Sequence, residues 1–199
     1  MVNQEKYHFW IKWTLISTGI VPLSYLVSLI AVLLVHGSFG FNMMEEGTHL
    51  SQTLMQIAGG AVLGLGTGIY QFSMLKKIFP VSKSWVYSLL IGFALTELII
   101  CLILLQMHVN RYELRFIEGK PLPEALFFAC AGLIVGLFQW PILKRYFNRS
   151  GLWIVASALG WGVCVLPTTI NVFAFIAGAL LYGAITGATL MWVMIRQQE

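Results

Sequence analysis

The chain has 199 residues, of which 58% are hydrophobic and only 10% are charged, and its mean hydropathy is +0.82. A soluble domain carries about 25% charged residues, so this composition excludes an ordinary soluble protein and predicts an integral protein of the lipid bilayer. The formal net charge is +4, but the basic residues stand beside hydrophobic segments, so nucleic acid is not expected as a partner.

Six apolar stretches separated by short polar loops are each long enough to cross about 30 Å of hydrocarbon as a helix. In chain order they are residues 10–35, 50–75, 85–107, 122–143, 152–170 and 172–195. A lipid-exposed backbone must satisfy its own hydrogen bonds, and the ten-residue alternation of a membrane barrel is absent. The expected fold is therefore all-α, with six transmembrane helices in one domain over residues 1–199. Lys6 and Lys12 stand near the start of the first stretch, as basic residues do in a signal peptide, but the stretch lacks a small-x-small cleavage site and is expected to be retained.

Basic residues are distributed unevenly between the two sets of loops, nine on one side and three on the other. The larger set is Lys6, Lys12, Lys76, Lys77, Lys83, Lys144, Arg145, Arg149 and Arg196, and the smaller set is Arg111, Arg115 and Lys120. Because lysine and arginine are retained on the cytoplasmic side, both termini are predicted to be cytoplasmic. Trp85 and Trp153 begin two spans on the basic side, where tryptophan typically anchors a helix at the membrane interface.

A block in the second span returns in the fourth. The sequence GLGTGIYQFSMLKKIF at residues 64–79 returns as GLIVGLFQWPILKRYF at residues 132–147. When residues 61–92 are aligned with residues 129–160, eleven of the 32 positions are identical. The last span keeps the same spacing in a degraded third copy, with leucine in place of the glutamine. The sequence therefore predicts three pseudo-repeated helical hairpins, at approximately residues 10–75, 85–143 and 152–195.

The repeated glycines and glutamine share one helix face, because they are spaced by four and three residues. Small residues let two helix backbones approach closely in lipid. The predicted packing residues are Gly64, Gly68, Gly132, Gly136, Gly183 and Gly187. Gln71 and Gln139 then either bridge neighbouring helices or line a polar pocket in the cytoplasmic half of the membrane. Leu190, at the third position, favours the structural interpretation.

Glu97 is the least expected residue, because it falls near the middle of the third span, where an ionised carboxylate is costly. A structural interpretation is a protonated side chain hydrogen-bonded to Tyr25, Ser24 or Tyr182. The functional alternative is a group that carries a coupling proton or touches a substrate. The candidate binding residues are therefore Glu97, Gln71, Gln139, Tyr25 and Tyr182.

Other chemistry-bearing residues give weak signals. The cysteines, Cys101, Cys130 and Cys164, fall inside spans without CxxC spacing and are predicted to be small apolar core residues. The histidines His36, His49 and His108 fall at outer helix ends without metal-ligand spacing, so no metal is expected. The chain has no aspartate and no GxSxG, HExxH or P-loop motif, so neither an enzyme nor a cofactor is predicted.

The block GLIVGLFQW at residues 132–140, followed by LKRYF and WIVASALGWGV, resembles small multi-pass membrane proteins of bacteria that carry this block in tandem and have no assigned activity. The chain departs from their pattern at Phe72, where tryptophan is usual, and at Leu190. The resemblance implies a bacterial inner-membrane protein but no activity.

The leading functional hypothesis is a non-enzymatic module that transports or binds a small-molecule ligand. The alternative is an accessory or structural subunit that packs its helices against a membrane-protein partner or against itself as a homo-oligomer, and an intramembrane enzyme ranks third. Polar residues facing a cavity would favour the first hypothesis, whereas glycine faces exposed to lipid would favour the second.

Overall fold

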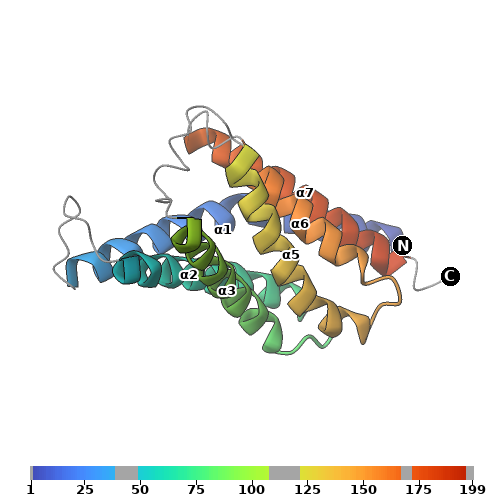
Figure 1. Ribbon diagram of the computed structural model, residues 1–199. Coiled ribbons are helices and arrows are strands. Elements are labelled where there is room, and N and C mark those ends of the chain that lie inside the picture. Colours follow the sequence, from blue (N-terminus) through green and yellow to red (C-terminus); the bar gives the residue numbers. More distant parts are fainter. Residues whose placement is uncertain (1, 39–48, 108–121, 167–171, 196–199) are drawn as a thin grey trace.

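The computed structural model describes residues 2–38, 49–107, 122–166 and 172–195, and within these ranges all regular secondary structure is helical (Figure 1). The helices are α1 (Val2–Ser38), α2 (His49–Leu75), α3 (Ser84–Met107), α5 (Leu122–Lys144), α6 (Leu152–Val165) and α7 (Val172–Ile195). The all-α class predicted from the sequence is confirmed for this part of the chain.

Five helices are long and apolar enough to cross a membrane. The candidate spans are Tyr7–Leu34, Thr53–Leu75, Ser84–Ile103, Glu124–Lys144 and Ala174–Ile195. Helix α6 has 14 residues and so extends about 21 Å, which is less than the roughly 30 Å of a hydrocarbon core. The expected span 152–170 is thus present as a helix only to Val165, and residues 167–171 lie outside the described ranges.

The outside of the bundle is covered by large apolar side chains. Leu15, Leu33 and Leu34 of α1 and Leu126 of α5 are all more than half exposed. A soluble monomer rarely presents a continuous apolar surface of this kind, whereas lipid tails solvate it without cost. The surface therefore agrees with the membrane class inferred from the composition.

Helix α2 packs most extensively on α3, α5 on α6, and α1 on α7, although α1 and α7 stand at opposite ends of the sequence. Figure 1 shows α1 running beside α7, with the start of α1 and the end of α7 on the same side of the bundle. The indole N–H of Trp10 donates to the Ala184 carbonyl oxygen at 3.1 Å and joins the two helices there. Weaker contacts of α1 with α2, α3 with α5, and α6 with α7 close the bundle.

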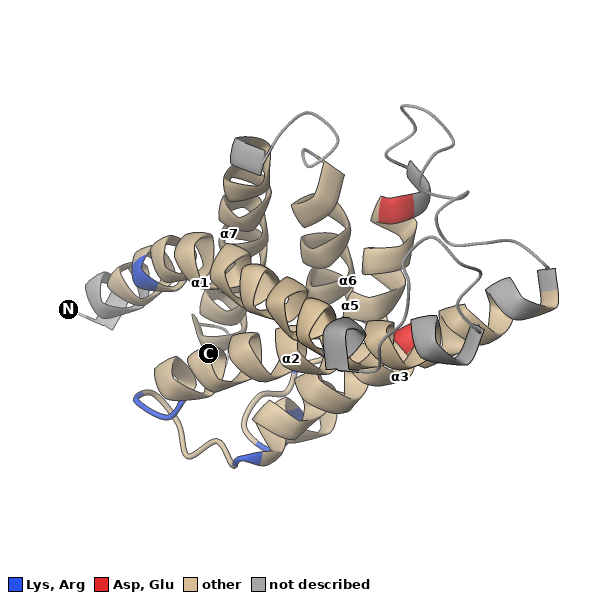
Figure 2. Cartoon of the chain, turned by 90° about the vertical axis from the view of Figure 1, so that its left-hand side faces the viewer, with Lys and Arg blue, Asp and Glu red and all other residues tan. Residues whose placement is uncertain are grey.

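Charge is segregated along the bundle. Figure 2 shows the basic residues around the start of α1 and around the loops that join α2 to α3 and α5 to α6, while the acidic residues lie away from these loops, within α3 and in the first turn of α5. The described part of the chain therefore has a basic end, formed by these loops, and an opposite end that is free of described lysine and arginine.

Candidate functional site

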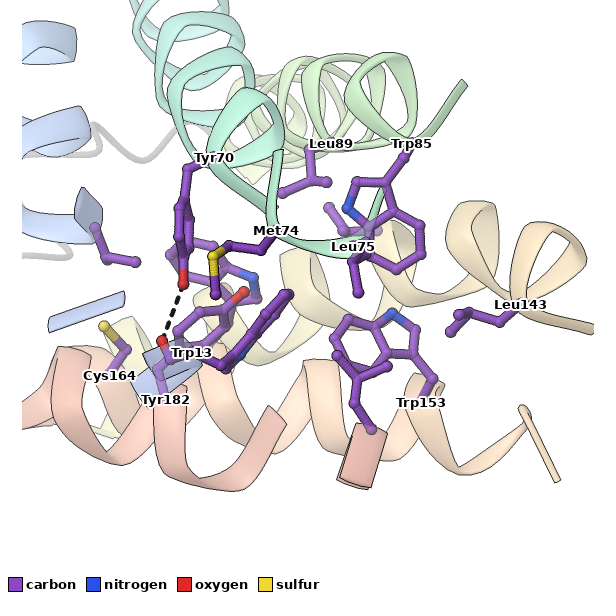
Figure 3. Close-up of a cluster of buried hydrophobic side chains, with 14 of the residues drawn as sticks. Trp13, Tyr70, Met74, Leu75, Trp85, Leu89, Leu143, Trp153, Cys164 and Tyr182 are labelled. Atoms are coloured by element: carbon purple, nitrogen blue, oxygen red, sulfur yellow. Dashed lines mark hydrogen bonds between the residues drawn. The ribbon is translucent and has the colours of Figure 1, made fainter. Parts of the chain in front are cut away.

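Three tryptophans from different helices meet inside the bundle (Figure 3). Trp13 of α1 and Trp85 of α3 are 0% exposed, and Trp153 of α6 is 1% exposed. The ring centroids of Trp85 and Trp153 are 5.6 Å apart, and those of Trp13 and Trp153 are 6.5 Å apart. The interpretation of Trp85 and Trp153 as interface anchors is therefore wrong, because both rings turn inward and their N–H groups bond to buried amides.

Each repeated glutamine accepts a hydrogen bond from the tryptophan 14 residues further along the chain. The Nε1 of Trp85 donates to Gln71 Oε1 at 3.0 Å, and the Nε1 of Trp153 donates to Gln139 Oε1 at 2.7 Å. Gln71 Nε2 donates to the Tyr182 hydroxyl at 2.5 Å, and Gln139 Nε2 makes a long 3.4 Å contact with Gln71 Oε1. We call Gln71, Gln139, Trp85 and Trp153 the Gln–Trp layer.

The amides of the Gln–Trp layer are occupied by other protein groups. Gln71 and Gln139 are each 1% exposed, and a buried amide is costly unless its polar atoms are paired. Their bonds join α2 to α3 and α7, and α5 to α6 and α2. This arrangement favours the structural interpretation of the two glutamines over a polar pocket.

In the third copy of the repeat, the buried tryptophan N–H bonds to a different acceptor. Leu190 is buried, and its side chain has no atom that accepts a hydrogen bond. The Nε1 of Trp13 instead donates to Thr186 Oγ1 at 2.9 Å, one turn earlier on α7. Thr186 in turn donates to the Tyr182 carbonyl oxygen at 2.7 Å. Sequence reasoning missed Thr186, because its hydroxyl matters only once α1 lies against α7.

The repeated glycines lie where two helix backbones touch. A Cβ atom added to Gly64 would come within 3.0 Å of the Leu89 carbonyl oxygen, and one added to Gly132 would do the same at Ser157, the equivalent of Leu89 in the repeat. Only a residue without a Cβ fits such an approach. The remaining contacts pair Gly68 with Val86, Gly136 with Ile154, Gly183 with Thr14 and Ser17, and Gly187 with Trp13. All six predicted packing glycines are thus buried inside one chain.

Glu97 is buried and faces the protein. Its Cγ lies 2.7 Å from the position that a Cβ on Gly60 of α2 would take, so its side chain covers this glycine. Two of the partners considered from the sequence have contacts of their own. The Tyr182 hydroxyl accepts from Gln71, and the Tyr25 ring packs edge-on against Phe175 at 5.1 Å.

Three aromatic rings from three helices surround the indole of Trp161 on α6. The ring centroids of Phe93 and Tyr182 are each 4.7 Å from that of Trp161, and the Phe128 ring stacks at 6.4 Å. We call Phe93, Phe128, Trp161 and Tyr182 the Trp161 cluster. Trp161 lies eight residues after Trp153, about 12 Å further along α6 from the basic end.

The Trp161 indole N–H is the unusual group of this cluster. Trp161 is 1% exposed, and within the described part of the chain its Nε1 has no hydrogen-bond partner. Buried donors nearly always have a partner, so an unpaired one needs a physical reason. The sequence carries one signal for this residue, since Trp161 takes the place that Phe93 holds in the preceding copy of the repeat.

The prediction that the cysteines are core residues is correct for Cys164 and wrong for Cys130. Cys164 is buried and Cys101 is partly buried, but Cys130 is exposed on the outside of α5. The buried face of α5 follows Ala131, Val135 and Gln139, and Cys130 falls outside this helical periodicity. The side chains of His36, His49 and His108 lie outside the described residues.

Among the buried polar groups, which also include the unpaired hydroxyls of Thr14, Thr67 and Ser150, two sets follow one another along the bundle. The Gln–Trp layer lies nearer the basic end with its amide groups engaged, and the Trp161 cluster lies beyond it with a buried donor that no described protein group accepts. Comparison with protein-family models, curated proteins and solved structures finds no match to the chain.

Proposed function

We propose that the protein is a non-enzymatic membrane module that binds or transports a small molecule, and that the Trp161 cluster contacts this ligand. The observation that carries the proposal is the buried indole N–H of Trp161, which has no acceptor among the described residues. An unsatisfied buried donor costs about 1–3 kcal/mol, and the penalty is larger in hydrocarbon, where water does not compete. A ligand oxygen or nitrogen that accepts this hydrogen bond removes the penalty.

The surroundings of Trp161 favour a particular ligand class. Phe93, Phe128 and Tyr182 supply flat apolar faces, and small-molecule sites are typically apolar with a few polar groups that fix orientation. Glu97 stands one helical turn from Phe93 on the same face of α3 and adds a second polar group. The inferred ligand is a mostly apolar or aromatic molecule that carries at least one hydrogen-bond acceptor.

We further propose a topology with six crossings and both termini in the cytoplasm of a bacterium. The proposal is supported by the segregation of basic residues at one end (Figure 2). In this topology the ligand cluster lies on the outer side of the Gln–Trp layer. Helix α6 then contributes to the remaining crossing.

The repeat unit inferred from the contacts is a glycine-bearing helix followed by its tryptophan-bearing partner. Equivalent contacts recur in the pairs α2–α3 and α5–α6, as the bonds Gln71 to Trp85 and Gln139 to Trp153 illustrate. The pair α7–α1 carries the corresponding bond from Trp13 to Thr186. We therefore infer that the third hairpin is completed by the first helix of the chain, which shifts each expected hairpin boundary by one helix.

The alternative of a subunit that packs through its glycine faces is less well supported. Those faces are buried against α1, α3 and α6 of the same chain, so they are not free to receive a partner helix. The remaining apolar surface is suited to lipid tails.

The proposal is tested by native mass spectrometry of the protein purified in lipid nanodiscs from its own membranes. We expect a small-molecule mass on the wild-type protein and roughly tenfold lower occupancy on Trp161→Phe, which keeps an aromatic ring but loses a hydrogen bond of about 1.4 kcal/mol. Trp140→Phe is the matched control, because Trp140 lies at the basic end beside Lys144. Equal occupancy in wild type and Trp161→Phe would refute the assignment.

A further inference from the structure

The two loops at the basic end form one connected surface. The Tyr146 hydroxyl donates to the Pro80 carbonyl oxygen at 2.7 Å, and the Phe79 ring packs against the rings of Tyr146 and Phe147 at 5.3 and 5.2 Å. Six exposed basic side chains surround this junction, and we call them the basic face. They are Lys76, Lys77, Lys83, Lys144, Arg145 and Arg149.

Three members of the basic face lie over aromatic rings. The Lys76 ammonium is 5.6 Å from the centroid of the Phe72 ring, and the Lys144 ammonium is 5.0 Å from that of Trp140. These two pairs occupy equivalent positions in the two copies of the block, so the arrangement belongs to the repeat. The Arg149 guanidinium lies 5.4 Å from the ring of Trp192 at the end of α7. In the first two pairs the ring stands one helical turn further into the apolar helix than the cation does.

Protein carboxylates do not neutralise this face among the described side chains. Glu97 is buried against Gly60, and Glu124 stands in the first turn of α5, at the opposite end of that helix from Lys144. The positive charge of the basic face therefore needs counter-charges from outside the described protein. Its position at the ends of membrane helices puts it at the depth of lipid headgroups.

We propose that the basic face binds the phosphate groups of anionic phospholipids, with each cation–ring pair holding one headgroup. The cation contacts the lipid phosphate, and the neighbouring ring contacts the glycerol and upper acyl region of the same lipid. Clusters of four to eight basic residues beside a membrane helix attract anionic lipids in general, and here six of them stand around two connected loops. The inference stands independently of the ligand proposed for Trp161.

Tryptophan quenching tests the proposal, because the buried tryptophans do not contact lipid. Trp13, Trp85, Trp153 and Trp161 are at most 1% exposed, so lipids with brominated chains quench mainly Trp10, Trp140 and Trp192. The protein is placed in vesicles of phosphatidylcholine that contain phosphatidylglycerol as the minor lipid, and either lipid carries the bromine. We expect a preference for phosphatidylglycerol of about tenfold, equivalent to about 1.4 kcal/mol.

In the triple variant Lys76→Gln, Lys144→Gln and Arg149→Gln, the preference for phosphatidylglycerol over phosphatidylcholine should fall to a ratio close to one. The fold should stay intact, because all three side chains are exposed. Lys12→Gln is the control, because Lys12 is exposed on α1 and is not part of the basic face, and it should keep most of the preference. Equal quenching by both lipids in wild type, or an unchanged preference in the triple variant, would overturn the proposal. Loss of the preference on adding millimolar glycerol phosphate would also overturn it, because the face would then bind a soluble phosphate.

Discussion

A double-mutant cycle on Gln139 and Trp153 measures how strongly the Gln–Trp layer stabilises the bundle. Gln139→Leu reproduces the residue of the third copy and leaves the Trp153 N–H without its acceptor at 2.7 Å. Trp153→Phe leaves the Gln139 carbonyl oxygen without its donor. Each single change therefore adds the penalty of an orphaned buried group, about 1–3 kcal/mol, to its packing cost. The double variant removes both partners and leaves no orphan.

The expected coupling energy follows from the geometry. Hydrogen bonds between membrane helices have coupling energies of about 0.6 kcal/mol on average and about 1.7 kcal/mol at most. Both partners here are 1% exposed and their bond is short, so we expect a coupling energy of about 1–1.7 kcal/mol, in the upper part of that range. Reversible unfolding in bicelles, titrated with dodecyl sulfate, gives the four free energies of unfolding.

The control cycle combines Gln139→Leu with Trp10→Phe, whose indole bonds to the Ala184 carbonyl oxygen instead. That pair should be additive within about 0.5 kcal/mol. If the Gln139 and Trp153 changes are equally additive, the bond between them does not stabilise the fold and the role assigned to the layer is wrong.

Three further predictions concern packing, topology and Glu97. Gly132→Ala should lower the free energy of unfolding by more than about 1–3 kcal/mol, because its Cβ would meet a backbone carbonyl within 3.0 Å. Gly19→Ala is the control, because a Cβ there has nothing within 4 Å, and it should be neutral or stabilising by about 1 kcal/mol. Similar losses of stability at both sites in the unfolding assay would contradict the close approach at Gly132. A cysteine at Ser82 should react with a membrane-impermeant maleimide only after the cells are opened, and one at Glu124 in intact spheroplasts; the reverse pattern would invert the proposed orientation. Glu97→Gln keeps a donor of similar shape, so the unfolding free energy should change by less than about 0.5 kcal/mol while occupancy of the small molecule in native mass spectra falls; unchanged occupancy would assign Glu97 a structural role only.

The helices and their packing glycines follow from local sequence properties. Hydropathy predicts where each apolar helix lies, because membrane insertion depends on the composition of about 20 residues. The repeat also shows that Gly64 and Gly132 have the same environment, and their contacts with Leu89 and Ser157 are indeed equivalent. The pairing of α1 with α7 is different, because it depends on contacts between the two ends of the chain that no local pattern encodes.

The tryptophans show why the site was harder to predict. Trp85 and Trp153 begin their helices, and tryptophan at that depth is typically an interface anchor. The depth of a residue does not say whether its ring faces lipid or a neighbouring helix. The 14-residue spacing from each glutamine to its tryptophan was present in both copies, and it is the feature that would have indicated the bonds. Trp161 carries no comparable signal, because its unpaired N–H is a property of the assembled bundle.

The most direct test of the proposed function is the indole region of the ¹⁵N–¹H spectrum of the protein in nanodiscs. The chain has seven tryptophans, and the loss of one cross-peak in Trp161→Phe assigns the resonance. The spectrum is recorded for the protein as isolated from its membranes, and again after exhaustive detergent exchange that strips any bound small molecule. If Trp161 holds the ligand, its cross-peak shifts on removal while that of Trp153, bonded to Gln139 in both states, stays in place. A Trp161 cross-peak that is unchanged, together with a shifted Trp153 cross-peak, would contradict the account and move the ligand to the Gln–Trp layer.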